Sequence, residues 1–360
     1  MKQNISNHLI MNNPTIQTRR YVVVTAVLAA LLVVLGIANL LIGSIHIPAG
    51  DIFDMICGNR IDNHIWEVIV FQSRIPTIIT AALAGAALAV CGLLLQTVFN
   101  NPLADPSILG ISSGASLGVA VFMLVGGNAL AAVCGSEVAQ YVTTLTGAFA
   151  GAMLVLVTLI VFSSFVKSAT MLLIIGIMVS YLTSSAISLL NFFASEQEVH
   201  SFVIWGMGNF SSVSTAELPV FAMIVLVAIV CSLLMVKPLN ALLLGNRYAE
   251  NLGVNIKHTR NALLIITGLL TAVVTAYCGP ISFLGLVIPH VARLSLNTSN
   301  HNILLPVTML AGAVMALLCT LLSVLPASLG IIPINAITPI IGVPVIIYII
   351  LNRRKLQYFN

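Results

Sequence analysis

ITAALAGAALAVCGLLLQTVF (Ile79–Phe99), NNPLADPS (Asn100–Ser107) and ILGISSGASLGVAVFMLVGG (Ile108–Gly127) follow one another in the chain. Two apolar runs, each long enough to cross a lipid bilayer, flank a short polar segment that holds two prolines. Proline fixes the backbone angle φ, and asparagine and aspartate side chains bond to backbone groups that a turn leaves free. The pattern predicts two membrane helices joined by a rigid polar turn, called here the NPLADP loop (Asn100–Ser107).

The rest of the chain has the same apolar character. Of its 360 residues, 59% are hydrophobic and 7% are charged, whereas a soluble domain carries about 25% charged residues. No soluble fold hides this much apolar surface, so the composition predicts an all-α polytopic membrane protein. The net charge of +4 is modest and indicates no nucleic-acid partner.

Polar residues separate the chain into ten apolar segments, each of which we expect to cross the membrane. The seventh and eighth are short and are separated by Gly279-Pro280, so counting them as one gives nine crossings instead. The ten are Tyr21–Ile42, Ile78–Phe99, Ile108–Val125, Val142–Phe165, Met171–Ala194, Leu218–Val236, Ala262–Tyr277, Ser282–Leu296, Leu304–Leu325 and Ile334–Leu351.

Charge bias gives the direction of these segments. With ten spans and a cytoplasmic N-terminus, 12 of the 14 basic residues fall on the cytoplasmic side and eight of the ten acidic residues fall outside. Cytoplasmic loops are enriched in lysine and arginine, and nine spans would place Arg353 and Arg354 on the wrong side. We therefore predict cytoplasmic tails at 1–20 and 352–360 and a single ten-helix transmembrane domain at 21–351. The first apolar run is too long for a signal-peptide core and is expected to be retained.

Two of the predicted spans have similar sequences. LAGAALAVCGLL (Leu83–Leu94) and LAGAVMALLCTL (Leu310–Leu321) share several residues at one constant offset, and the two spans are expected to run in opposite directions. An inverted repeat, common in transporters, produces this pattern, and so does the recurrence of small residues in packed membrane helices.

Two patterns in the sequence could indicate a catalytic or a metal site. GISSG (Gly110–Gly114) matches a hydrolase nucleophile elbow, but it opens a membrane span and lacks partner residues; Gly110, Gly114 and Gly118 are better explained as a smooth ridge for a close helix. The histidines show no metal-binding spacing, and His290 is expected to be hydrogen-bonded structure. We predict no catalytic residue, no metal site and no cofactor bound by this chain.

Two further absences concern the source of energy. The sequence has no G-x-x-x-x-G-K-[ST] loop for ATP and essentially no acid within its spans, which counts against a proton- or sodium-driven transporter. Cysteines follow no metal spacing either. Cys57 and Cys134 fall in loops predicted to be external, where a disulfide and two free thiols are both compatible with the sequence.

The fifth predicted span carries a polar stripe. Its members recur at helical spacing and share one face: Ser180, Thr183, Ser184, Ser188 and Asn191. In lipid such a face must contact protein or water. It therefore indicates either hydrogen bonding between helices or the wall of a translocation path, and uncharged hydroxyls suit a bulky cargo that must not stick.

KPLNALLLGNRYAENLGVNIKHTRN (Lys237–Asn261), called here the docking loop, is the longest predicted cytoplasmic loop. A simple connection needs only a few residues. Its apolar and polar residues alternate around two glycines, which predicts two short helices with a turn between them. Such a surface is typical of a docking site for a partner protein, although a helix resting on lipid gives a similar pattern.

Together these stretches resemble the FecCD/BtuC-like family of ABC importer permeases. The resemblance is carried by five blocks between Ser73 and Ile347: SRIPTIITAALAGAALAVCGLLLQ, NNPLADPSILGISSGASLG, LLLGNRYAENLGVN, GPISFLGLVIPHVARL and ITPIIGVPVII. It implies a fold of ten membrane helices, a homodimer with the path between its two copies, two separate ATPase subunits that use ATP and Mg, and a substrate-binding protein that docks outside.

The resemblance also implies residue roles. The first cytoplasmic gate corresponds to Asn101 and Leu103, and the second gate to Ser168 and Ala169. The binding protein is expected to dock at Arg74, with Arg60 as a substitute for two family arginines that are replaced here by Thr77 and, approximately, Val324. Contacts to the ATPase are expected within Leu239–Gly253, at Leu239, Leu242, Leu244, Gly245, Asn246, Ala249, Leu252 and Gly253.

We therefore expect the permease subunit of a binding-protein-dependent ABC importer in the bacterial inner membrane, with lipid, a second copy, ATPase subunits and a binding protein as partners. The expected cargo is a ferric siderophore-type metal chelate, with haem or a cobamide (vitamin B12) as alternatives. A secondary transporter is the rival from a different class; it predicts an intramembrane carboxylate and no large docking loop.

Overall fold

The computed structural model describes residues 14–59, 63–124, 137–166, 168–325 and 330–351. Within these ranges every regular element is a helix, as predicted. The long helices are α2 (Pro14–Leu41), α5 (Ile75–Val98), α6 (Ile111–Leu124), α8 (Glu137–Phe165), α9 (Ala169–Phe193), α11 (Leu218–Leu234), α14 (Ile256–Cys278), α15 (Leu284–Leu296), α16 (His301–Val324) and α17 (Ile334–Leu351). The short ones are α3 (Ala49–Ile56), α4 (His64–Val68), η1 (Ile69–Arg74), α10 (Glu196–Gly206), η2 (Phe210–Ser212), α12 (Val236–Leu242) and α13 (Asn246–Asn251).

Each of the ten predicted spans overlaps one of the long helices. In the described residues, six helices are long and apolar enough to cross a membrane, or seven if α11 and α12, which meet at a bend of 51°, form one span. Helices α6, α15 and α17 are apolar but shorter. The chain is therefore a multi-pass membrane protein, while ten crossings and the direction of the termini stay predictions.

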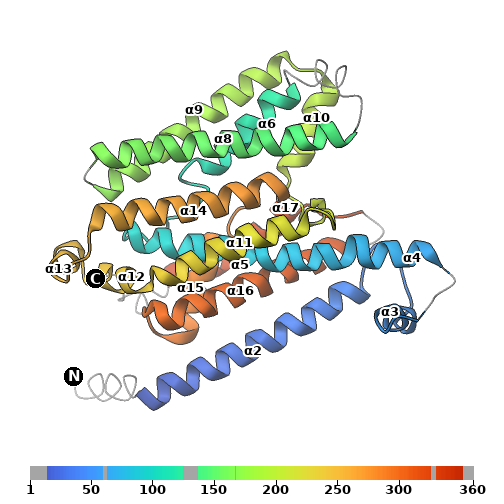
Figure 1. Ribbon diagram of the computed structural model, residues 1–360, viewed down its shortest axis with the longest axis horizontal. Coiled ribbons are helices and arrows are strands. Elements are labelled where there is room, and N and C mark those ends of the chain that lie inside the picture. The colour runs from blue at the N-terminus through green and yellow to red at the C-terminus, as the bar shows by residue number, and fades with distance from the viewer. Residues whose placement is uncertain (1–13, 60–62, 125–136, 167, 326–329, 352–360) are drawn as a thin grey trace.

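The helices stack side by side in a slab. Figure 1 shows α9 along one edge, α2 along the opposite edge, and α5 between them, with α3 and α4 at one end of the slab and α12 and α13 at the other. Helix α5 is buried over most of its length, which explains why it is apolar on every face.

Glycine pairs allow several of these helices to touch. A Cβ added at Gly85 would lie 2.3 Å from the carbonyl oxygen of Gly312, and the converse distance is also 2.3 Å. Helices α5 and α16 therefore cross backbone to backbone. These glycines occupy equivalent positions in the two LAGA segments, so the two similar segments contact each other at this crossing. An inverted repeat of the whole fold stays a prediction.

The glycine ridge on the third span is confirmed for two of its three members. Gly114 and Gly118 of α6 lie against α8, where added Cβ atoms would meet the carbonyl oxygens of Gly151 and Gly147 at 2.6 and 2.0 Å. Gly110 precedes α6 with φ of +81° and lies beside α9. It therefore provides a left-handed turn as well as a close approach.

Two helical boundaries differ from the prediction. Helix α2 begins at Pro14, ahead of the expected start at Tyr21. Residues 64–77, predicted as part of an external loop, continue helically into α5 through the π-helical turn η1. Pro76 lacks the N–H that would bond four residues back, and the wider π turn directly before it accommodates that loss. The seventh and eighth spans are two helices, because Gly279 adopts φ of +75° and ends α14.

Candidate functional site

The NPLADP loop places one leucine at its uncovered tip. Asn101 stabilises the turn because its Oδ1 accepts the backbone N–H of Leu103 at 2.9 Å. The Leu103 side chain is 49% exposed, although it is among the most apolar of residues. The loop therefore presents an uncovered leucine at the position that the resemblance assigns to the first gate; its action as a gate stays a prediction.

His290 secures this loop to α15. Its Nε2 lies 2.7 Å from the carbonyl oxygen of Pro102, and the side chain is buried. A carbonyl oxygen only accepts hydrogen bonds, so Nε2 carries the proton. The interpretation of His290 as hydrogen-bonded structure is confirmed, and no cluster of three metal-ligating side chains occurs in the described part of the chain.

Asp105 is the buried anchor of the same loop. Its Oδ2 accepts the backbone N–H of Ser107 at 3.1 Å and also the Ser107 hydroxyl. Burial raises the pKa of the Asp105 carboxyl, because an apolar environment disfavours the charged form. The turn chemistry expected of an aspartate at this position is therefore present.

The predicted second gate lies between α8 and α9. Ser168 is the N-cap of α9 and is exposed, and Ala169 packs on the hydrophobic cluster that contains Ala104 and Leu109. The turn and the segment around the NPLADP loop thus share one apolar cluster.

The polar stripe of α9 bonds mainly to its own helix. The hydroxyls of Ser180, Thr183 and Ser188 donate to the carbonyls of residues 176, 180 and 184 at 2.9–3.0 Å. Ser184 and Ser188 are exposed, Ser180 and Asn191 are half-buried, and Thr183 is buried. These three hydroxyl bonds do not join α9 to another helix, and the lining of a path by the stripe stays a prediction.

The docking loop forms two short helices, α12 and α13, with a turn between them, as predicted. Its predicted contact residues divide into two sets. Leu239 and Ala249 are fully buried and hold the loop to the bundle, and Leu242 is half-buried. The exposed ones are Leu244, Gly245, Asn246, Leu252 and Gly253.

The exposed face of this loop carries an apolar stripe that the sequence reading only partly included. Leu244, Tyr248 and Leu252 are 61%, 68% and 65% exposed. Tyr248 lies in α13, Leu252 is the C-cap of this helix, and Leu244 stands in the turn before it. We call these three residues the docking stripe. Tyr248 was missed, although its spacing from the two leucines was the available signal.

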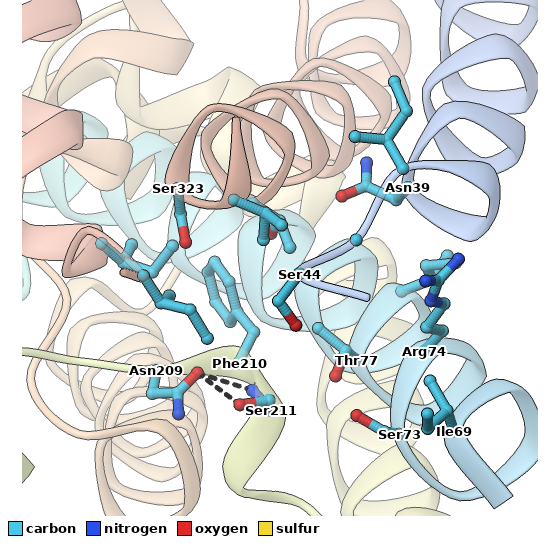
Figure 2. Close-up of a pocket in the computed structure, with 17 residues that line it drawn as sticks. Asn39, Ser44, Ile69, Ser73, Arg74, Thr77, Asn209, Phe210, Ser211 and Ser323 are labelled. Carbon is cyan, nitrogen blue, oxygen red and sulfur yellow. Dashed lines mark hydrogen bonds between the residues drawn. The ribbon is translucent and has the colours of Figure 1, made fainter. Parts of the chain in front are cut away.

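A pocket of about 140 Å³ lies at the other end of the bundle. Figure 2 shows hydroxyl and amide side chains around it, including Ser44, Asn209 and Ser323. Arg74, Thr77 and Val324, the positions that the resemblance connects with binding-protein docking, all line this pocket. Arg74 is the sole charged side chain among the described residues that line it, and Arg60 lies outside the described residues.

Arg74 has a structural role at the end of α2. The side chain is 7% exposed, and its guanidinium donates to the carbonyls of Leu40, Leu41 and Ile45. The carbonyls at a helix C-terminus lack partners within the helix, and a cation there is favourable. Arg74 therefore caps the C-terminus of α2. To dock a binding protein, its guanidinium must attract acidic groups while it is bonded to these carbonyls, or must release the carbonyls first.

Cys57 has a free, exposed thiol, and Cys134 lies outside the described residues, so a disulfide between the two stays a prediction.

The two ends of the bundle are joined by the same helices. Helix α5 begins at the pocket and ends at the NPLADP loop, and α16 runs the opposite way, from beside α12 to the pocket. A helix of 24 residues spans about 36 Å. The exposed Leu103 and the docking stripe therefore share one end of the molecule, and the polar pocket lies at the other.

Comparison with known proteins gives consistent results. The model of the FecCD transport family matches residues 31–352. The vitamin B12 import system permease protein BtuC of Salmonella paratyphi A is 33% identical over 291 residues, which covers 80% of this chain and 85% of the relative. The protein of the same name from Klebsiella pneumoniae is 34% identical over 289 residues, covering 80% and 84%.

Among solved structures, an ABC transporter assigned to the metal-chelate type, in an inward-facing conformation, superposes with a TM-score of 0.76 at 31% identity. The match covers 95% of this chain and 100% of that one.

Proposed function

Because this chain belongs to the FecCD transport family of ABC permeases, we propose that it pairs with a second copy to form the channel of a binding-protein-dependent importer. Two separate ATPase subunits, which use ATP and Mg, dock at the end with the docking stripe. The binding protein docks at the end with the pocket. The chain itself is a transport subunit and performs no catalysis.

The observation that carries this proposal is the division of the molecule into two functional ends. The exposed docking stripe lies at the same end as the NPLADP loop with Leu103, which suits a cytoplasmic partner that moves the docking loop. A polar pocket at the far end of α5 suits a partner that delivers cargo from outside. The bias of basic residues agrees with this direction, with ten crossings, both termini in the cytoplasm and a location in the bacterial inner membrane.

The exposed side of α9 supports the proposed dimer and the position of its path. Figure 1 shows this helix at the edge of the slab, and its large apolar side chains, such as Met178, Tyr181 and Leu182, are exposed. In the proposal this edge faces the second copy, so that the Ser180–Asn191 stripe lines the path and the two copies of Leu103 close it below.

The proposed cargo is a ferric siderophore-type metal chelate, supported by the metal-chelate type of the solved structure. Vitamin B12 is the second candidate, because curated relatives carry that name. The pocket has one arginine where the resemblance implies two more, since Thr77 and Val324 stand at those positions. This thinner set of docking charges counts against the vitamin B12 assignment.

The docking stripe provides the test. Tyr248→Asp places a charge at the centre of the stripe, where an interface would bury it at a large desolvation cost. After purification from the source membrane, we expect the wild-type chain to carry an ATPase with a G-x-x-x-x-G-K-[ST] loop. Tyr248→Asp should reduce the amount of this ATPase at least tenfold.

Phe53→Asp is the matched control, because Phe53 is also an aromatic residue that is 68% exposed, but it lies at the opposite end on α3. It should retain the ATPase in full. Equal recovery with Tyr248→Asp and wild type, or a wild-type preparation with no ATPase, contradicts the proposal.

A further inference from the structure

One end of the docking loop is connected to the NPLADP loop through the half-buried Asn240 and the buried side chains of His301 and Thr97. Asn240 on α12 accepts the backbone N–H of His301 at 2.8 Å with its Oδ1, and the same oxygen lies 3.0 Å from His301 Nδ1. His301 Nε2 lies 2.9 Å from the hydroxyl of Thr97. Thr97 is near the last residue of α5, three positions before the NPLADP loop.

The direction of each bond follows from the chemistry of the groups. A backbone N–H only donates, so the Asn240 atom that faces it is the oxygen. His301 Nδ1 must then donate to that oxygen, and in a neutral imidazole Nε2 accepts. The Thr97 hydroxyl is its donor, and it shares its one proton between Nε2 and the carbonyl oxygen of Leu93, each at 2.9 Å. The three side chains therefore form a continuous chain of hydrogen bonds, with His301 fully buried.

The other end of the docking loop, Arg260 and Asn261, lies in the second turn of α14 (Ile256–Cys278) and contacts the end of α8 before the second gate. Arg260 donates through Nη2 to the carbonyl oxygens of Ser163 and Val166, the latter at 3.1 Å. Asn261 accepts the hydroxyl of Ser163 at 2.7 Å. These groups lie in the last turn of α8 and just beyond it, directly before Ser168.

The two connections differ from most hydrogen bonds of buried threonines in this protein. Thr308 of α16, for example, donates to the carbonyl of Leu304 in its own helix at 2.7 Å. Thr97 makes the same bond to Leu93 of its own helix at 2.9 Å, but it also contacts His301. Thr97 and Arg260 therefore join separate elements, and stretching either connection would leave polar groups unpaired away from water. Such connections resist separation of the elements that they join.

We propose that these are two independent tethers: Asn240–His301–Thr97 ties the docking loop to the first gate, and Arg260–Asn261 ties it to the second. A movement imposed on the docking loop is thereby transmitted to each gate by its own tether. The inference rests on the proposed function, since it assumes that an ATPase moves this loop. Thr97, His301 and Arg260 are positioning residues in this scheme.

The test follows the two gates separately. The complex with its ATPase is placed in lipid nanodiscs, with Leu103→Cys or Ser168→Cys as the reporter. Maleimide labelling at the reporter is measured by mass spectrometry of its peptide, with and without ATP and vanadate. Peptide detection keeps the native cysteines from interfering.

We expect Thr97→Val to reduce the ATP-dependent change at position 103 at least fivefold and to leave the change at 168 intact, with Thr97→Ser restoring it. Arg260→Met should give the opposite pattern. Thr308→Val, a matched loss of a buried hydroxyl, should alter neither. If Thr97→Val yields no folded complex, Asn240→Leu cuts the same tether from α12.

A wild-type response that Thr97→Val and Arg260→Met leave unaltered, or reduce equally at both positions, overturns the tethers alone. A wild-type complex whose labelling does not respond to ATP at either position overturns the proposed function, and the tethers with it.

Discussion

Leu103 is the residue at which the proposed path is closed. It stands uncovered on a loop that Asn101, His290 and Asp105 hold rigid from three sides. A plug of this kind acts by filling space, so the size of the side chain should decide how tightly it closes.

Leu103→Ala should therefore raise the passive permeability of the dimer several-fold without ATP. Release of a small fluorescent dye from liposomes containing the purified chain measures this. Leu325→Ala, also an exposed leucine but at the opposite end, should release dye at the wild-type rate. Identical release from Leu103→Ala and wild-type vesicles would refute the assignment of the plug.

Individual residues also show the limits of sequence reading. Asn101 and Leu103 could be predicted because NPLADP is a long, specific pattern. The link between Thr97, His301 and Asn240 joins positions far apart in the chain, and no local sequence pattern predicts it. Arg74 could be recognised as a conspicuous arginine, but its bonds to α2 depend on how that helix ends against α5.

At the scale of helices, close crossings hold the central helix in place. A Cβ at Gly92 of α5 would lie 1.7 Å from the carbonyl oxygen of Gly285 in α15. No side chain fits between two backbones at that distance, so any larger residue must push α15 and its His290 away from α5.

Gly92→Ala should destabilise the protein by about 1–3 kcal/mol, the usual cost of overpacking a core, and lower the thermal unfolding temperature in detergent. Gly36→Ala on α2 is the matched control, because an added Cβ there meets nothing within 4 Å. An unfolding temperature of Gly92→Ala equal to that of the control would show that the crossing is looser than described.

Apolar run length predicted the location of the long helices well, since a membrane helix needs an unbroken apolar stretch. It did not predict α3, α4 or α10, which are short and partly polar, nor the continuous helix from His64 into α5. Polar residues in such segments are typical of loops, and only tertiary packing and the π turn before Pro76 select a helix there.

At the scale of the whole molecule, we propose that the chain provides a path, a plug and two docking ends and that a partner provides the energy. The sequence has no phosphate-binding loop, and its family could be identified from five motif blocks. The cargo could not, because the predicted path is lined by hydroxyls that discriminate weakly, and selection would reside in the separate binding protein.

Uptake into sealed liposomes tests this account most directly. The chain is reconstituted alone or with its ATPase and binding protein, and accumulation of radioactive ferrichrome and cyanocobalamin is followed with ATP, a proton gradient or a sodium gradient. The account predicts accumulation only for the full complex with ATP, with ferrichrome preferred. Accumulation by the chain alone, driven by an ion gradient, would contradict it.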